Sequence, residues 1–422
     1  MDTPMPPATQ PSIAIIGGSI TGPTLALRLL QEGFQDVHVF EASPQPTALA
    51  GGIIGLEHTA LGVLDTIGVP QEQIIPYPSE RVVTIKVADQ LEAGRVQTLY
   101  PGRNTIWQLI NNSLLSRLPA EHLHTAMRAT AIGTDENNRA RVEFANGTTV
   151  SADLVVFADG RRSVGRQLLD PGRQLGYAGV VAWRGQSSWL PADMKDFTRY
   201  EPLGTRLAIF PTILRDGSVG TDWTFYLPMT TEHFKQLCGG DPVQRVFVLP
   251  HQVTPAAKLF VTNMTAELLP APALQLMEHT TSWAAAPLLT IDPPKQMIFK
   301  MGGSRALLIG DALAPVFPLT GRGANNGIEQ ADALVTVLTQ CYRYDANVDA
   351  ALQGWQRRML PTVEQALQLG PQLAQGLGLR PTPYQAANLR SVGSPKPSPK
   401  SSPSPRGTTG VQRGGQPRRP MR

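Results

Sequence analysis

Runs of apolar residues mark the strands of a mixed structure along this chain. Residues 13–16 are apolar at every position, and the runs at 154–157 and 306–309 have the same character. Strands that are apolar throughout are buried on both faces, as they are in parallel sheets covered by helices. Residues 23–30 then carry apolar side chains at helical spacing, so the chain is predicted to begin with a strand, a turn and a helix.

Alternation of apolar and polar residues is typical of the middle of the chain. Segments 180–184, 206–210 and 218–226 alternate as strands of an antiparallel sheet do, and residues 232–276 are predicted to be mostly helical. Elsewhere the patterns predict strands at 81–87 and 96–100, a hairpin turning at Asn146-Gly147, a helix at 104–118, and a glycine-containing loop followed by a short helix at 51–70.

These elements predict an α/β fold with α+β elements. Buried strands alternating with helices predict a Rossmann-like nucleotide-binding domain, and the alternating segments predict a second domain with an antiparallel sheet, where pockets tend to form. The predicted boundaries are 11–75, 101–175 and 291–390 for the first domain, which is therefore discontinuous, and 76–100 and 176–290 for the second.

A glycine turn joins the first predicted strand to the first predicted helix. Gly17 and Gly22 hold the outer positions of the pattern G-x-G-x-x-G, and Ser19 stands at its middle position. A helix that begins after such a turn directs its free N–H groups and the positive end of its dipole at one point, which suits a pyrophosphate. By itself this turn is equally compatible with an ordinary connection between a strand and a helix.

An acidic residue stands where a dinucleotide-binding fold needs one. Residues 37–41 alternate like a strand that ends at Glu41. In the dinucleotide fingerprint an acid about 20 residues beyond the glycines accepts from a ribose hydroxyl. With Glu41 in register, dinucleotide binding becomes the preferred interpretation of the glycine turn.

Two further buried runs end at an aspartate. Asp159 and two arginines follow the run that ends at residue 158, and Asp311 follows the run 306–309. Ligands of α/β sheets gather at the carboxyl ends of strands, so both aspartates are candidates for one cleft. Asp-Gly is also a common turn, and that alternative stays open for Asp159.

The positive charge of the chain belongs to one end of it. The net charge is +4, but residues 391–422 contribute +7 and contain no acid, which leaves −3 for the rest. This Pro-, Ser- and Arg-rich segment is predicted to be a disordered basic tail, and residues 1–10 are predicted to be flexible. The balance argues against nucleic acid as a partner of the folded core, while weak contact of the tail with RNA or an anionic surface stays open.

The remaining composition favours a cytoplasmic globular protein. No apolar run approaches the roughly 18 residues that a membrane span needs, and the first residues do not read as a secretory signal. Cys238 and Cys341 stand far apart and in no metal or redox spacing. We therefore expect no metal and a reducing compartment.

In this order the three markers resemble the single-component FAD-dependent aromatic hydroxylases, the flavin monooxygenases similar to p-hydroxybenzoate hydroxylase. The markers are the glycine turn with Glu41, the Asp159 block and the Asp311 block, and the similarity covers roughly residues 11–375. Residues 17–20, Trp107 and residues 177–185 are most similar to the 2,6-dihydroxypyridine 3-monooxygenase-like branch.

The resemblance implies an enzyme with an FAD-binding domain and a substrate domain. Such an enzyme uses NADH or NADPH as a transient reductant and O₂ to hydroxylate a small electron-rich aromatic or N-heteroaromatic compound, through a flavin C4a-hydroperoxide. The resemblance is also compatible with a homodimer, and it implies no membrane partner.

Carried over residue by residue, the resemblance assigns the FAD pyrophosphate to the glycine turn, the adenosine ribose to Glu41 and the ribityl chain to Asp311. Pro318 and Asn325 would border the flavin ring as the catalytic candidates. Ser163 and Arg166 match the continuation of the Asp159 block. The cofactor-binding candidates are Gly17, Gly18, Ser19, Ile20, Gly22, Glu41, Trp107, Asp159, Gly310, Asp311, Gly323, Ala324 and Asn325.

The chain also departs from the family pattern. Ala314 stands where many members carry a histidine, and Trp107 stands where an arginine or glutamine commonly reaches the flavin. No general base is identified, because none of the histidines falls in a flavin marker. Packing in the core stays the alternative for each aromatic substrate candidate. The substrate candidates are His58, Trp183, Arg184, Phe210 and Tyr226.

The same motifs bear on other functions. A flavin halogenase needs a Trp-x-Trp-x-Ile-Pro segment, which none of the six tryptophans forms. A nicotinamide dehydrogenase would use the glycine turn but leaves the two aspartate blocks unexplained. A flavin-binding module, or an NAD(P)H oxidoreductase that does not hydroxylate, stays open.

Overall fold

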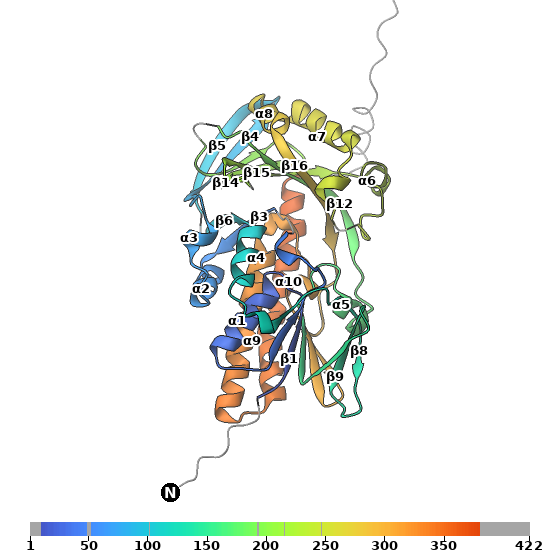
Figure 1. The fold of residues 1–422 in the computed structure, drawn as a ribbon. Coiled ribbons are helices and arrows are strands. Elements are labelled where there is room, and N and C mark those ends of the chain that lie inside the picture. Colours follow the sequence, from blue (N-terminus) through green and yellow to red (C-terminus); the bar gives the residue numbers. More distant parts are fainter. Residues whose placement is uncertain are drawn as a thin grey trace, which may run out of the picture. The chain divides into compact units, whose positions relative to one another are not determined.

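The apolar runs form a mostly parallel sheet in the computed structural model, which describes residues 10–48, 52–100, 102–191, 194–214, 216–245 and 247–379 (Figure 1). Within these residues the strand order is β17-β18-β11-β1-β2-β7, and β17 alone runs antiparallel to its neighbour. We call it the parallel sheet. Its strands are β1 (Ile13–Ile16), β2 (Val37–Phe40), β7 (Leu123–His124), β11 (Leu154–Phe157), β17 (Ile298–Met301) and β18 (Ser304–Leu308).

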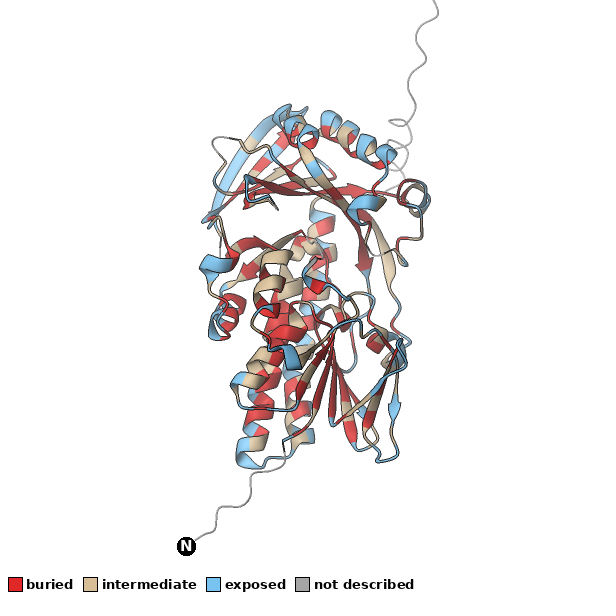
Figure 2. Cartoon of the chain, in the orientation of Figure 1, coloured by how far each residue is buried: buried red, intermediate tan, exposed pale blue. Residues whose placement is uncertain are grey.

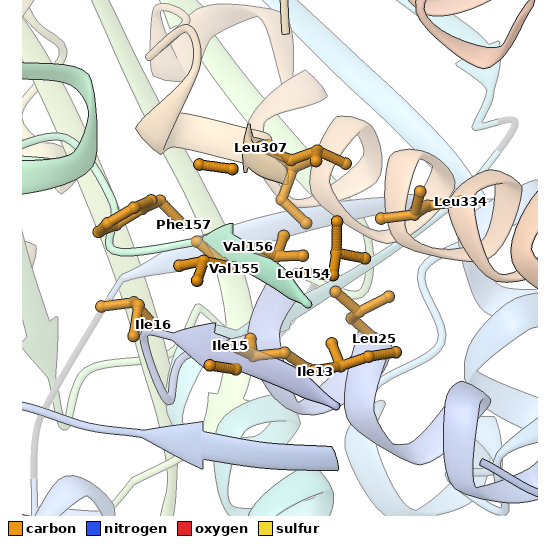
Figure 3. Packing of buried hydrophobic residues seen from close by; sticks show 14 of the residues in the cluster. Ile13, Ile15, Ile16, Leu25, Leu154, Val155, Val156, Phe157, Leu307 and Leu334 are labelled. Atoms are coloured by element: carbon orange, nitrogen blue, oxygen red, sulfur yellow. The ribbon is translucent and has the colours of Figure 1, made fainter. Parts of the chain in front are cut away.

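The core of this region lies between the central strands and two helices, α1 (Thr21–Gln31) and α9 (Arg322–Tyr344). Figure 3 shows Leu25 of α1 and Leu334 of α9 among the side chains of β1 and β11, and both leucines are fully buried. Complete burial of such a side chain stabilises the fold by about 1.5–3 kcal/mol. Burial on both faces is the reason why β1 and β11 are apolar at every position.

Glycine allows α9 to cross α1 at close range. A Cβ at Gly327 would lie 2.1 Å from Thr21 Oγ1, and a Cβ at Gly310 would lie 3.0 Å from the same atom. The start of α1, the end of β18 and α9 therefore meet at Thr21. This contact brings the glycine turn and the Asp311 block together.

A second sheet confirms the antiparallel prediction for the middle of the chain. Among the described residues its order is β16-β12-β15-β14-β13-β4-β5, and only β13 and β4 pair in parallel. We call it the large sheet. Its strands are β4 (Arg81–Ala88), β5 (Leu91–Leu99), β12 (Gly176–Ser187), β13 (Phe197–Glu201), β14 (Arg206–Ile213), β15 (Val219–Pro228) and β16 (Thr280–Thr290).

Helices cover one face of the large sheet. Figure 1 shows α7 and α8 over its outer face, and Figure 2 shows that buried residues concentrate in its central strands while β5 is largely exposed. The helices between β15 and β16 are α6 (Thr231–Cys238), α7 (Pro255–Leu268) and α8 (Pro272–Glu278).

One long helix contacts both sheets. The end of the long helix α10 (Val348–Gly376) packs through Ala374 against Val180 and Tyr226 of the large sheet, while Trp355 of the same helix lies in the core of the parallel sheet. The other elements are β3 (Ile53–Glu57), α2 (His58–Thr66), α3 (Gln71–Ile74), β6 (Gly102–Ile106), α4 (Trp107–Leu115), β8 (Ala129–Thr134), β9 (Ala140–Phe144), β10 (Thr149–Ala152) and α5 (Val164–Leu169).

Two sequence predictions are wrong in detail. The helix expected at 104–118 begins only at Trp107, because the preceding residues belong to β6. The segment expected to be a loop before α2 is strand β3, which pairs with β6. This pairing supplies backbone hydrogen bonds that a local pattern cannot reveal. The predictions made for residues 1–9, Gly51 and 391–422 lie outside the described residues.

The two sheets take their strands from the two sets of segments predicted to be domains. All described residues nevertheless belong to one compact unit, so the division into domains stays a prediction. No helix in the described part of the chain is both long and apolar enough to cross a bilayer.

The close packing of Gly22 against Gly17 in the glycine turn leads to a prediction about stability. A Cβ at Gly22 would lie 1.9 Å from the carbonyl oxygen of Gly17, so Gly22→Ala is expected to destabilise the protein by more than about 2 kcal/mol. Gly62, on the exposed side of α2, has open space around it, so Gly62→Ala is expected to stabilise by about 0.5–1 kcal/mol. Urea unfolding of both variants measures the difference, and a Gly22→Ala variant as stable as the parent would contradict this packing.

Candidate functional site

A cavity of about 530 Å³ lies between the carboxyl ends of the parallel strands and one face of the large sheet. Its first wall, which we call the strand-end wall, is formed by residues that follow β1, β11 and β18, among them Ser19, Arg161 and Asp311. The opposite wall, the sheet wall, is lined by Val82, Thr84, Arg184, Phe197, Arg199, Arg206, Ala208, Thr224 and Tyr226. The three markers of the sequence therefore reach a single cavity.

The glycine turn has the geometry of an anion-binding site. Gly17 has a φ of +118°, and a Cβ there would lie 2.4 Å from the carbonyl oxygen of Ala158. No side chain of the described residues caps the N-terminus of α1, and its first turn contains no acid. Its free N–H groups can therefore bind a phosphate. The Ser19 hydroxyl accepts a hydrogen bond from Trp107 Nε1 over 3.0 Å, which links Trp107 to this turn.

Glu41 lies directly beside the glycine turn. Its Oε2 accepts from the backbone N–H of Gly18 over 2.7 Å, and its Oε1 accepts from that of Ser43 over 2.6 Å. The carboxylate is thus fixed at the carboxyl end of β2, where the fingerprint places the acid that contacts a ribose.

The structure gives Asp159 a different role from the one expected. Its Oδ2 accepts from the N–H groups of Val164 and Gly165, so the carboxylate caps α5, while Gly160 and Arg161 line the cavity in its place. Burial raises the pKa of Asp159. Its other oxygen, Oδ1, is buried with no hydrogen-bond partner among the described residues.

Asp311 does line the cavity, and its carboxylate lies 3.5 Å from Arg161 Nε. Burial raises the pKa of this carboxyl, and the positive charge of Arg161 opposes the increase. Gly310 precedes it and donates its N–H to the side chain of Gln330 on α9 over 2.7 Å.

Arg166 joins the Asp159 block to the Asp311 block. Its buried guanidinium donates to the carbonyl oxygens of Arg161, Asp311 and Ala312 over 2.5–3.3 Å. Ser163 caps α5 by accepting from the N–H of Arg166. The two motif residues therefore hold the loops that follow β11 and β18 in one arrangement.

The first turn of α9 completes the strand-end wall. Gly323, Ala324, Asn325 and Pro318 all line the cavity. The Asn325 amide is already engaged, because it accepts from the N–H of Glu57 and donates to the carbonyls at residues 55 and 321. Asn325 thus fixes β3 against α9 and has little capacity left to bind a reactant.

The substrate candidates separate into two groups. Arg184 and Tyr226 line the cavity, whereas Trp183 and Phe210 are only 0% and 1% exposed and belong to the core. Trp183 follows the alternation of β12 and faces Phe260 of α7, with the ring centroids 6.4 Å apart. The sequence analysis is wrong to place His58 in the pocket. His58 is exposed at the first position of α2 and does not line the cavity, although the preceding residue, Glu57, does.

Sequence reasoning missed Arg199 and Arg206 of the sheet wall. Arg199 lies in the middle of β13 and Arg206 is the first residue of β14, so the available signal was an arginine within a predicted strand. That signal is weak, because the sequence does not show which face of a strand is covered.

Asp222 is buried behind Arg184, beside a smaller cavity of about 50 Å³ that both residues line. Its Oδ2 accepts from Gln186 Nε2 over 3.3 Å, and its Oδ1 has no partner among the described residues. Burial raises the pKa of Asp222 to about 7, against the opposing charge of Arg184.

The residues at the strand-end wall fit a flavin dinucleotide, and comparison with known proteins agrees. A family model described as an FAD binding domain matches residues 10–231, so the chain belongs to this family and binds FAD. The resemblance to FAD-dependent hydroxylases inferred from the motifs is confirmed.

Individual relatives cover most of the chain. It is similar to 2,6-dihydroxypyridine 3-monooxygenase of Paenarthrobacter nicotinovorans, with 29% identity over 84% of this chain and 88% of the relative. It is also similar to 6-hydroxynicotinate 3-monooxygenase of Bordetella bronchiseptica, with 27% identity over 78% of this chain and 83% of the relative.

Solved structures agree on the fold. The structure of 2,6-dihydroxypyridine-3-hydroxylase from Arthrobacter nicotinovorans matches with a TM-score of 0.78 and 25% identity, over 88% of this chain and 94% of that one. Klebsiella pneumoniae HpxO complexed with FAD and uric acid matches with a TM-score of 0.70 and 18% identity, over 90% and 92%, and supports the fold alone.

The buried carboxyl of Asp222 leads to a prediction about how the stability of the protein depends on pH. Its pKa is higher in the folded chain than in the unfolded one, so it contributes stability at low pH that is lost as the pH rises through about 7. Asp222→Asn cannot ionise. Between pH 5 and pH 8 the parent protein is therefore expected to lose on the order of 3 kcal/mol more stability than this variant.

Urea unfolding at the two pH values measures this difference. Asp65→Asn, on the exposed side of α2, is the matched control and should keep the pH dependence of the parent. Equal pH dependence of the parent and the Asp222→Asn variant would show that Asp222 is not a buried titrating group.

Proposed function

We propose that the protein is an FAD-dependent monooxygenase that uses NADH or NADPH and O₂ to hydroxylate a small electron-rich aromatic or N-heteroaromatic compound. One observation carries this proposal: a single cavity is lined on one wall by the residues of the flavin motifs and on the other by the large sheet. A flavin held at the first wall would present its ring to a compound held at the second.

The strand-end wall supplies the groups that an extended dinucleotide needs. In this proposal the N-terminus of α1 binds the pyrophosphate, Glu41 accepts from the ribose, and Asp311 accepts from hydroxyls of the ribityl chain. The N-terminus of α9, which lines the cavity, would lie beside the ring, where the helix dipole would stabilise negative charge. When bound, FAD supplies the redox chemistry that activates O₂, and the protein supplies position and environment.

Two tyrosines of the cavity hold their protons. Burial raises the pKa of Tyr100 to about 12, and burial also raises the pKa of Tyr226. Tyr100 donates to Asn104 Oδ1 over 3.1 Å. At neutral pH neither hydroxyl is therefore a base. The proton of Tyr100 is already donated to Asn104, so in this proposal Tyr226 is the tyrosine that donates to an oxygen of the substrate.

Apolar side chains from both walls limit the access of water. Val82 and Ala208 of the sheet wall and Val316 of the strand-end wall all line the cavity. Exclusion of water prevents side reactions and strengthens the polar interactions that remain. The activities for which the two relatives are named, on a dihydroxypyridine and a hydroxynicotinate, support an N-heteroaromatic substrate. Cytoplasmic location and a homodimer stay predictions.

Product analysis tests the proposed reaction. The purified protein with its flavin is mixed with NADH or NADPH and a panel of phenols and hydroxypyridines under ¹⁸O₂. We expect coenzyme oxidation to accelerate with one class of compound and one labelled oxygen atom to appear in its product. Coenzyme oxidation without labelled product would favour the alternative, an NAD(P)H oxidoreductase that does not hydroxylate.

Removal of the Asp311 carboxylate tests the proposed flavin contact. Asp311→Ala is expected to raise the Kd for FAD at least about tenfold, equivalent to about 1.4 kcal/mol, because the hydroxyls of the bound chain lose an acceptor. Flavin fluorescence during titration of the apoprotein gives the Kd. Asp349→Ala, which removes an exposed carboxylate paired with Arg305, is the control and should bind FAD normally. Unchanged affinity in Asp311→Ala would refute the assignment.

A further inference from the structure

Four arginines of the described chain line the cavity, and two of them have a carboxylate partner. Arg161 lies 3.5 Å from Asp311, and Arg206 Nη2 lies 2.5 Å from an oxygen of Glu201. Arg184 and Arg199 have no carboxylate within ion-pair distance among the described residues. The Nε of each is also buried there without a hydrogen-bond partner.

The nearby acids compensate these two guanidinium groups only in part. Both oxygens of Glu201 are occupied, one by Lys86 and the other by Arg206. Asp222, behind Arg184, has a pKa of about 7 and is therefore substantially protonated at neutral pH. A buried charge is costly unless it is paired, and within the described residues neither of these two cations has a carboxylate at ion-pair distance.

Strand register places the two arginines on one row across the large sheet. Arg184 pairs with Thr224, Thr224 with Ala208, and Ala208 with Arg199. Three strand spacings separate the arginines, which corresponds to roughly 14 Å between their Cα atoms. The two side chains between them are small, so this row forms a floor with a guanidinium at each end.

The position of each guanidinium is fixed by its surroundings. The guanidinium of Arg199 lies over the ring of Phe197, 4.9 Å from the ring centroid. That of Arg184 lies against Gly52, where a Cβ would come within 2.8 Å of Nη1. A planar anionic group would therefore meet donors that are already oriented, and an arginine can bind a carboxylate through two parallel hydrogen bonds.

We propose that the substrate is an aromatic compound with a negatively charged group, a carboxylate or an ionised ring oxygen, and that one of the two arginines, Arg184 or Arg199, binds this group at its end of the floor formed by Thr224 and Ala208. The inference rests on the proposed function and specifies its substrate class. It also explains why positive charge is retained at a buried wall.

Binding of matched compounds tests the inference. The protein with its flavin is titrated with 6-hydroxynicotinate and with its neutral amide, and in a second pair with 4-nitrophenolate and 4-methylphenol, while the flavin absorption spectrum reports binding. The first pair tests a carboxylate and the second a ring oxyanion. We expect the parent protein to bind the anionic member of at least one pair ten or more times more tightly.

Arg184→Gln and Arg199→Gln identify the residues responsible. At least one variant is expected to lose this preference while it binds the neutral compound within about twofold of the parent. Arg81→Gln removes an exposed arginine from β4 of the same sheet and is expected to keep the preference. Flavin content and NAD(P)H oxidation without substrate should be unchanged in Arg81→Gln, and flavin content should be unchanged in all variants.

Gly52→Ala provides a test that keeps both charges. Its added methyl group displaces the Arg184 guanidinium and should weaken anion binding if Arg184 contributes, even where removal of an arginine prevents folding. No charge preference in the parent for either pair, or a preference that persists in both arginine variants, would overturn the inference. Hydroxylation of neutral compounds alone would overturn it and leave the proposed function intact, whereas anion binding without any oxygenated product would defeat the proposed function alone.

Discussion

The buried guanidinium of Arg166 holds together the two loops on which the cavity depends. It donates to carbonyl oxygens of the loop after β11 and of the turn after β18, and so fixes the position of Arg161 relative to Asp311. Backbone carbonyls in a buried region need such donors, because an unsatisfied group there is costly. The parallel strands bring their carboxyl ends to one edge of the sheet. The hydrogen bonds of Arg166 then fix the loops that follow two of these strands, so that the loops form one wall of the cavity.

The two walls differ in how their charges are balanced. On the strand-end wall Arg161 lies near Asp311, and beside this wall Glu41 accepts from the backbone N–H of Gly18 in the glycine turn. On the sheet wall Arg184 and Arg199 have no acid within ion-pair distance among the described residues. A cavity with one compensated wall and one positive wall suits a cofactor that contacts hydroxyls and phosphates on one side and an anionic reactant on the other.

The sequence predicted the strand ends well because their signal is local. A continuously apolar run followed by a glycine or an aspartate indicates the end of a buried strand, and Glu41 and Asp311 lie there as expected. The orientation of a side chain depends on tertiary contacts that no local pattern contains. Asp159 therefore turned toward α5, His58 faced outward, and the sheet wall contained Arg199, which alternation alone could not assign to a covered face.

The structure of the protein with FAD bound is the most direct test of the central claim that three strand ends form one flavin site. We expect the pyrophosphate at the N-terminus of α1, the ribose within hydrogen-bond distance of Glu41, and the flavin ring in the cavity between Asp311 and the large sheet. A flavin ring outside that cavity, or an FAD that contacts only one of the three strand ends, would contradict the claim.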